Sequence, residues 1–324
     1  MSNPETLLDV SDLKVHFPTA DGGTVHAVDG VSFTIRNGVA YGIVGESGSG
    51  KTTVAQTCAR LVEPTSGMIR LKGQDITAIK GDALRSIRKD IQFVFQDPYA
   101  SLNPRERAGS IVRRPLDLMS IGSRSSRKAR VDELFEIVGL HPEQQDLFPH
   151  QFSGGQRQRI GIARALASQP SLVICDEPVS ALDVAIQAQI LNLLARLKSE
   201  FGLSYLFISH DLAVVQHLCD VIAVMYLGTI VEVGTKRQIF QNPLHPYTRA
   251  LISAVPSTST VGRSERIRLE GEPPSPINLP TGCRFASRCS RSQPECLVSA
   301  PELQEVSDQH SVACRRVDAD GNWV

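Results

Sequence analysis

The segment GESGSGKT at residues 45–52 restricts the possible folds of this chain more than any other feature. It follows an apolar run at residues 39–44 and precedes Val54, Cys58 and Leu61, which are spaced as one face of a helix. The pattern GxxxxGK[ST] between a strand and a helix is typical of a loop whose backbone N–H groups wrap phosphates at the positive end of the helix. The alternative, a glycine-rich loop without a ligand, does not account for this setting.

Two side chains at the end of this loop add chemistry that the backbone lacks. Lys51 can reach the β- and γ-phosphates, and the Thr52 hydroxyl can ligate Mg²⁺. The sequence therefore predicts a site for a nucleoside triphosphate and Mg²⁺. Its candidate residues are Gly45, Glu46, Ser47, Gly48, Ser49, Gly50, Lys51, Thr52 and Thr53.

A second apolar run, LVICDE at residues 172–177, ends in two carboxylates. This is where a phosphate-loop fold places its metal ligand and the group that activates water. Asp176 is the candidate Mg²⁺ ligand, and Glu177 is the candidate general base or water-orienting group. Read alone, the pair could also be a helix N-cap.

A third motif, FSGGQ at residues 152–156, stands just before the helical sequence RQRIGIARALA. Its serine and glycine N–H groups form a second candidate anion site at a helix start, made by Ser153, Gly154, Gly155 and Gln156. Since the first loop already holds the phosphates, this second site makes sense if it covers a nucleotide bound to another subunit. The alternative is a turn that only caps a helix.

The periodicity of the rest of the chain predicts an α/β fold. Val31, Phe33 and Ile35 alternate with polar residues, which indicates antiparallel sheet in the N-terminal part. Continuous apolar runs at 39–44, 172–175 and 205–208 suit parallel strands covered by helices on both faces. Arginine-rich polar sequence at about residues 97–160 predicts a helical insert between two strands.

Composition excludes several classes of protein. The 34 basic residues balance the 34 acidic ones, so the sequence gives no sign of a nucleic-acid partner. The longest apolar stretch, residues 221–233, is shorter than a bilayer-spanning helix, and the N-terminus lacks a secretory pattern. We therefore expect a cytoplasmic chain whose seven cysteines are thiols or metal ligands.

The motifs together resemble the ATPase domain of ABC transporters over about residues 7–250. The ordered set is Phe17, GESGSGKT, Gln96, FSGGQ, LVICDEP, Ser180-Ala-Leu-Asp183 and His210. This resemblance implies that Phe17 stacks on adenine and that Gln96 lies at the metal and at the interface with a membrane subunit. It also implies that Asp183 contacts the opposing subunit and that His210 touches the γ-phosphate. Outside this order, Phe17 reads as a core aromatic and His210 as a strand-end histidine.

Further segments resemble the F-type ATPase subunit of dipeptide/oligopeptide importers. They are FQDPYASLNPR, EPVSALDVAIQAQILNLL, HPYTRALISAVP and GEPPSPINLPTGCRF. The resemblance implies ATP-driven peptide import at the cytoplasmic face of a bacterial cell membrane. The implied partners are a D-type ATPase subunit, two permease subunits and an extracytoplasmic solute-binding protein.

Other readings stay open at this point. Related importers carry nickel, glutathione, murein peptides or opine-like compounds. An ABC ATPase acting on ribosomes or DNA would need tandem ATPase domains, a coiled-coil insertion or a basic surface, none of which the sequence has. A kinase-like transferase is a further alternative, but such an enzyme would have no use for the SGGQ motif.

The C-terminal part carries a further candidate site. We expect an ATPase domain at residues 1–254 and a proline-rich region at 255–324 with four clustered cysteines, Cys283, Cys289, Cys296 and Cys314. Arginines beside them favour thiolates. Four thiolates in a loop-rich segment fit a metal centre. By resemblance to similar tails the favoured centre is a [4Fe–4S] cluster, with zinc or free and oxidised cysteines as alternatives.

Overall fold

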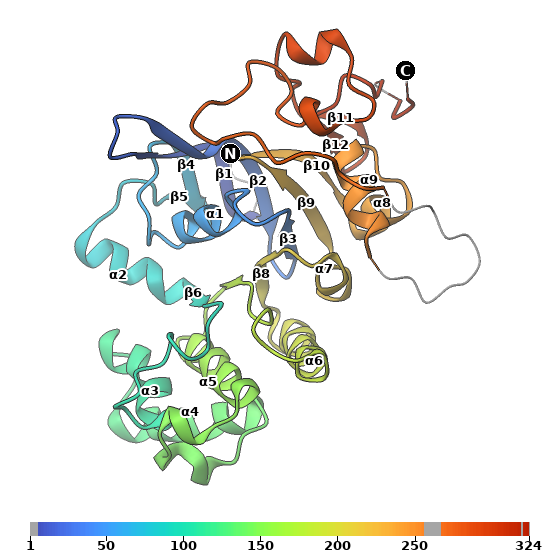
Figure 1. The fold of residues 1–324 in the computed structure, drawn as a ribbon. Coiled ribbons are helices and arrows are strands. Elements are labelled where there is room, and N and C mark those ends of the chain that lie inside the picture. The colour runs from blue at the N-terminus through green and yellow to red at the C-terminus, as the bar shows by residue number, and fades with distance from the viewer. Residues whose placement is uncertain (1–5, 256–266, 319, 324) are drawn as a thin grey trace. The chain divides into compact units, whose positions relative to one another are not determined.

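The computed structural model describes residues 6–255, 267–318 and 320–323 (Figure 1). Their contacts divide the chain into two compact units. The first unit consists mainly of Leu71–Phe207, with shorter segments up to Leu8 and at Ile35–Val39. The second unit consists of Asp9–Thr34, Ala40–Arg70 and Ile208–Val324. The predicted boundary after residue 254 stays a prediction, and it adjoins residues 256–266, which lie outside the described part.

The second unit is built on strands from both ends of the chain. One set has the order β2-β1-β4 and another the order β11-β12-β10-β9-β3. In the second set β3 pairs with β9 in parallel, while β9, β10, β12 and β11 pair antiparallel. The strands, whose end residues Thr6–Leu8, Ile35–Arg36 and Leu71 belong to the first unit, are β1 (Thr6–Pro18), β2 (Thr24–Arg36), β3 (Ala40–Val44), β4 (Ser66–Leu71), β9 (Val221–Tyr226), β10 (Thr229–Thr235), β11 (Gln304–Ser307) and β12 (His310–Val312).

Short helices connect these strands. They are α1 (Lys51–Cys58), α7 (Leu212–Leu218), α8 (Lys236–Gln241), α9 (Pro246–Ser253) and the 3₁₀ turns η3 (Ala286–Arg288) and η4 (Pro294–Leu297). Between residues 267 and 301 only the two 3₁₀ turns are regular, as the proline content predicts.

The first unit holds the longer helices. Strand β6 pairs in parallel with β7. The chain between these two strands contains α3, α4 and α5, which pack against one another (Figure 1, green). Its elements are β5 (Gln74–Asp75), α2 (Gly81–Asp90), β6 (Ile91–Val94), α3 (Ala108–Leu118), α4 (Arg124–Ile137), η1 (Pro142–Asp146), η2 (Pro149–Gln151), α5 (Gly154–Leu166), β7 (Leu172–Asp176), α6 (Val184–Phe201) and β8 (Ser204–Ser209).

Burial follows the predicted periodicity with one exception. Val31, Phe33 and Ile35 of β2 are buried and their polar neighbours are exposed, while every residue of β3, β7 and β8 is buried. The α/β class is therefore confirmed. The prediction that Leu61 continues the buried face of α1 is wrong, because α1 ends at Cys58, Arg60 turns the chain at φ 54°, and Leu61 is 49% exposed.

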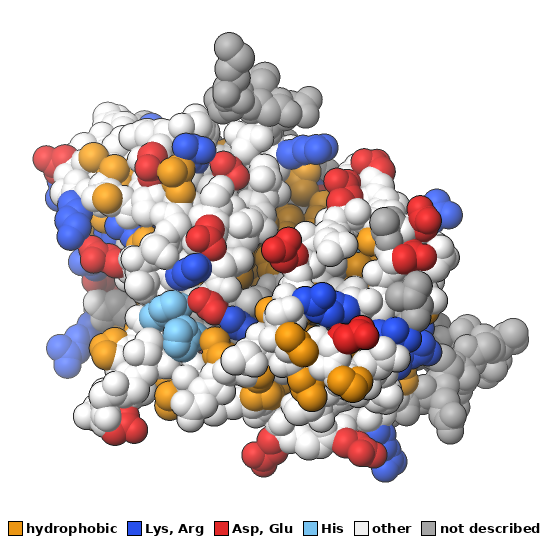
Figure 2. Space-filling model, turned by 90° about the horizontal axis from the view of Figure 1, so that it is seen from above, with side chains coloured by type: hydrophobic (Ala, Val, Ile, Leu, Met, Phe, Trp, Pro, Cys, Tyr) orange, Lys and Arg blue, Asp and Glu red, His pale blue; other side chains and the backbone are white. Residues whose placement is uncertain are grey.

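The surface agrees with the balanced composition. Figure 2 shows acidic and basic side chains interspersed over the described residues on one face of the molecule. Among the described residues, no helix combines the length and apolar character that crossing a bilayer requires.

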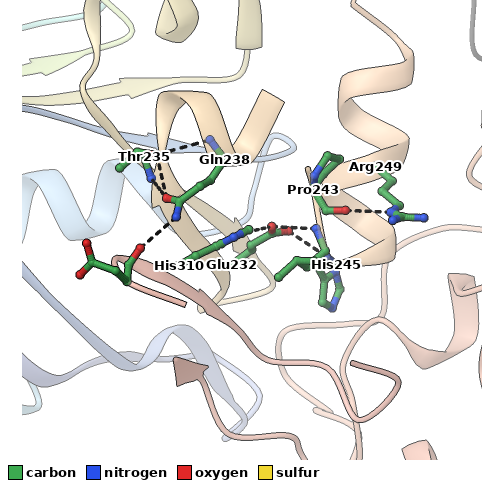
Figure 3. Close-up of polar contacts among 9 residues, drawn as sticks. Glu232, Thr235, Gln238, Pro243, His245, Arg249 and His310 are labelled. Carbon is green, nitrogen blue, oxygen red and sulfur yellow. Dashed lines mark hydrogen bonds and ion pairs between the residues drawn. The ribbon is translucent and has the colours of Figure 1, made fainter. Parts of the chain in front are cut away.

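A buried carboxylate fastens the C-terminal strands to the rest of the second unit (Figure 3). Glu232 on β10 is fully buried, and its two oxygens accept the backbone N–H groups of Leu244 and His245 at 2.8 Å each. The His310 imidazole on β12 lies 2.8 Å from the same carboxylate. Because a buried carboxylate needs every one of these partners, the contact fixes both the start of α9 and the register of β12.

Because His245 is buried at the start of α9, we expect the stability of the fold to fall at acidic pH. Burial lowers the pKa of His245 to about 4 despite the opposing effect of Glu232, and its Nδ1 accepts the N–H of Tyr247 at 3.1 Å. The ordinary pKa of 6.5 applies in the unfolded chain, so this stabilisation is complete above that pH and is lost as pH falls toward 4. Between pH 7.5 and 5.0 we expect a loss of about 2 kcal/mol from this residue, measured by urea unfolding.

A matched variant separates this residue from other titrating groups. His245→Asn keeps a side-chain acceptor at the helix start but does not titrate. We expect a shallower loss of stability with falling pH in this variant; an unchanged pH slope would contradict the assignment.

Candidate nucleotide-binding site

The predicted phosphate loop lies in the second unit between β3 and α1. A side chain at Gly50, which has φ +100°, would place its Cβ 2.1 Å from the Ala27 carbonyl oxygen. At Gly45 the Cβ would lie 2.1 Å from the carbonyl oxygen of Met225. Both positions therefore require glycine, because neighbouring backbone closes on the loop.

Lys51 and Thr52 begin α1 in different environments. The Lys51 side chain is buried, and its Nζ donates to the carbonyl oxygens of Gly45 at 2.9 Å and Glu46 at 2.8 Å. Thr52 is exposed in the first helical turn. The Lys51 ammonium is thus held inside the curve of the loop.

The loop also contacts two residues from late in the chain, which the sequence did not predict. The Arg288 guanidinium donates to both Glu46 carboxylate oxygens, at 2.7 and 3.0 Å, and only 7% of its side chain is exposed. The Tyr247 hydroxyl accepts the Glu46 N–H at 2.8 Å. Arg288 and Glu46 lie 242 residues apart, and no local pattern links them.

This pairing predicts that Arg288 supports ATP binding. In Arg288→Ala, Glu46 would keep an uncompensated negative charge inside a loop that receives polyphosphate, and the loop would lose its bidentate support. Because hydrogen bonds to charged groups contribute ~1.5 kcal/mol or more, we expect ATP affinity to fall about tenfold. A titration with a fluorescent ATP analogue measures this.

Two variants control the interpretation. Glu46→Gln combined with Arg288→Ala removes the charge together with its partner and should recover part of the affinity. Arg315→Ala removes an exposed arginine beside another cysteine and should change nothing. Equal affinity in wild type and Arg288→Ala would contradict the prediction.

The predicted carboxylates lie at the end of β7 in the first unit. Asp176 is buried, and Glu177 takes the left-handed backbone conformation at φ 45°, which is unusual for a residue other than glycine. The Gln96 side-chain amide donates to Glu177 Oε2 at 3.1 Å. The structure thus brings together Gln96 and Glu177, and a strained backbone at this point is typical of a functional position.

The SGGQ segment caps α5 in the first unit. The Ser153 hydroxyl accepts the Gln156 N–H at 3.3 Å, and the Gln156 side chain accepts the Ser153 N–H at 2.9 Å. A Cβ on Gly155 would lie 2.5 Å from the Ile186 side chain. Ser153 itself is exposed at the helix start, so the turn caps the helix, and its role as an anion site stays a prediction.

The remaining predicted residues are placed as follows. Asp183 is exposed in the first unit and caps α6, accepting the Ile186 N–H at 3.0 Å. Phe17 near the end of β1 is 40% exposed, so it is not a core aromatic. His210 follows β8 and is exposed. Phe17 and His210 belong to the second unit together with the phosphate loop.

The C-terminal cysteines lie around one small cavity in the second unit. Cys283, Cys289, Cys296 and Cys314 all line it, and its volume is about 20 Å³. All four are free thiols. Among the described residues no three of their sulfurs lie within 4.8 Å of one another, so they do not form a compact ligand set for a single ion.

The prediction that nearby arginines favour thiolates is wrong for Cys283, Cys289 and Cys314. Burial raises the pKa of Cys283 and Cys289, and that of Cys314 to about 11. Arg291 lowers the pKa of Cys289 by less than burial raises it. Any metal bound here must therefore displace protons, and its affinity must rise with pH.

The α/β fold and its phosphate loop define a P-loop nucleotide-binding protein, and the sequence is similar to known proteins of this class. Residues 28–180 match the family model of the ABC transporter, and residues 231–296 match that of the oligopeptide/dipeptide transporter C-terminal region. The oligopeptide transport ATP-binding protein AppF of Bacillus subtilis (strain 168) is 52% identical, covering 97% of this chain and 98% of the relative. The oligopeptide transport ATP-binding protein OppF of Escherichia coli (strain K12) is 50% identical, covering 97% of each.

Solved structures agree with this assignment. The dimeric, post-hydrolysis structure of the ATP-binding cassette MJ0796 with ADP and Pi has a TM-score of 0.65 and 30% identity, over 71% of this chain and 99% of that one. The chain therefore belongs to the ABC transporter ATP-binding proteins and, within them, to the oligopeptide transport group.

Proposed function

We propose that this chain binds and hydrolyses ATP to power the import of peptides through a membrane ABC transporter. The observation that carries the proposal is the presence in one chain of the phosphate loop, the β7 carboxylates and the C-terminal region that matches oligopeptide/dipeptide transporters. The catalytic features account for ATP use, and the C-terminal match accounts for the transporter group.

The proposed site uses one set of residues for the bound nucleotide and another for a partner's. Lys51 contacts the phosphates, and Phe17 stacks on adenine. Thr52, Gln96 and Asp176 are the proposed Mg²⁺ ligands. Glu177 accepts a proton from water or orients it, while His210 contacts the γ-phosphate.

The exposed helix start at Ser153 is the proposed cover for ATP on a second ATPase subunit, with Asp183 at the same interface. This division would give the exposed start of α5 a ligand in addition to its capping bonds. Hydrolysis then needs two subunits, so the isolated chain should turn over slowly.

The proposed assembly contains a D-type ATPase subunit, two permeases and an extracytoplasmic solute-binding protein. The chain would act at the cytoplasmic face of the membrane, with residues 1–254 as its ATPase domain. The test is copurification of the tagged chain with its membrane subunits, followed by ATPase assays in proteoliposomes. Stimulation by peptide-loaded binding protein is expected; stimulation by another cargo only, such as nickel or glutathione, would overturn the peptide assignment.

We propose in addition that the four C-terminal cysteines hold a metal centre, with [4Fe–4S] favoured over zinc. Support comes from the convergence of all four thiols on one cavity. A four-iron cluster separates its ligand sulfurs more widely than a single ion does, which suits sulfurs that are not in close mutual contact. Anaerobic purification should give a brown protein with about four irons per chain.

The control for this experiment is a cysteine outside the cavity. Cys289→Ser should lose the iron, and Cys219→Ala, which changes a buried cysteine at the end of α7, should keep it. A colourless, iron-free wild-type protein with a folded C-terminal region would overturn the proposal.

A further inference from the structure

Two histidines and one carboxylate converge on the strands at the N-terminal end of the second unit. His16 Nε2 on β1 lies 3.1 Å from Asp29 Oδ1 on β2 and 3.2 Å from His26 Nδ1, also on β2. All three ligand atoms lie within 4.8 Å of one another. None of these residues belongs to the proposed nucleotide site or to the cysteine cavity.

Direct hydrogen bonds among these three side chains cannot pair all of their facing atoms at once. His16 Nε2 faces the Asp29 oxygen and the His26 nitrogen at once, but it carries at most one proton. If His16 donates that proton to Asp29, it has no second proton to donate to the lone pair of His26 Nδ1. If His26 donates to His16, the unprotonated His16 nitrogen faces a carboxylate oxygen. A cation at the centre would serve all three atoms.

The separations match those of a tetrahedral metal site. Ligands ~2.0–2.1 Å from Zn²⁺ in tetrahedral geometry are about 3.3 Å from one another. The distances from His16 Nε2 to Asp29 Oδ1 and to His26 Nδ1, 3.1 and 3.2 Å, lie close to this value. The side chains of His16 and Asp29 are 21% and 22% exposed, so water can reach the fourth position.

A neighbouring arginine orients the carboxylate. Arg284 contacts Asp29 Oδ2, and it also donates to the Leu227 carbonyl oxygen at 2.6 Å. This leaves Oδ1 facing the histidines, as a carboxylate fixed by a second partner does in metal sites.

We propose that His16, His26 and Asp29 bind a divalent transition-metal ion such as Zn²⁺. Two imidazoles and one carboxylate favour this class of ion over Mg²⁺ or Ca²⁺, which prefer oxygen ligands. Arg284 already neutralises Asp29, which limits the affinity of the site.

The test is a titration of the purified full-length chain with Co²⁺, which reports ligand type by its visible spectrum. We expect one Co²⁺ per chain, with the visible d–d bands of four-coordinate Co²⁺, in the Cys289→Ser background, where the cysteine cavity lacks one ligand. Adding His26→Gln to this background should weaken Co²⁺ binding at least tenfold. Adding His150→Gln, which changes an exposed histidine of the first unit, should not.

A second ligand variant and the visible spectrum show whether Co²⁺ binds to the histidines or to the cysteines. His16→Gln should reproduce the loss seen with His26→Gln, while both variants keep the wild-type urea midpoint. Equal Co²⁺ affinity in the parent and in both variants, or a sulfur charge-transfer band as the only signal, would overturn the proposal. This readout needs no ATP hydrolysis, so it stands or fails apart from the proposed transport function.

Discussion

Replacing Glu177 by glutamine is expected to lower ATP turnover of the assembled transporter by about 10² or more while leaving ATP binding intact. Glutamine keeps the size of the side chain and an oxygen that can accept from Gln96, whose amide lies 3.1 Å from Glu177 Oε2. It cannot accept a proton from water. The change therefore removes the basic group without emptying the site.

The measurement has two parts. Phosphate release gives the turnover, and retention of radiolabelled ATP through gel filtration shows whether the closed complex accumulates. Glu136→Gln on α4 makes the same chemical change at an exposed position and should behave as wild type. Wild-type turnover in Glu177→Gln would reject Glu177 as the base.

The second large effect is expected on stability. Glu232→Gln would replace one acceptor oxygen with an NH₂ group that faces a backbone or imidazole donor in a fully buried position. Breaking a buried, fully bonded charged group typically costs ~3 kcal/mol or more. We expect urea unfolding to show a loss of this size.

The location of the loss can be checked as well as its size. Hydrogen exchange should accelerate first at His310–Val312, because β12 loses the contact that fixes it to β10. Glu305→Gln on β11 removes an exposed carboxylate and should change stability by no more than about 0.5 kcal/mol. If Glu232→Gln unfolds at the wild-type urea concentration, the carboxylate does not fasten the C-terminal strands.

Much of the fold could be predicted because its signals are local. Alternation in β2, continuous apolar runs in β3, β7 and β8, and the order of the motifs all lie within short segments of the sequence. The prediction about Leu61 failed because the end of α1 depends on a backbone turn at Arg60, which apolar spacing does not report.

The candidate site was predictable only where its residues form motifs. The phosphate loop and the pair Asp176 and Glu177 are contiguous in sequence, so their spacing carried the prediction. The Arg288 contact with Glu46 depends on the path of the chain between two distant segments. The arrangement of His16, His26 and Asp29 likewise depends on the pairing of two strands, and each residue read singly is an ordinary surface polar group.

Strand β12 makes the C-terminal region part of the sheet that leads into the phosphate loop. β12 pairs with β10, β10 with β9, and β9 with β3. A chain that ended after residue 254 would leave β10 as an open edge, with Glu232 deprived of His310. Open edges pair with other chains and aggregate. Removing this region is therefore expected to expose the β10 edge and to weaken the buried carboxylate site beneath it.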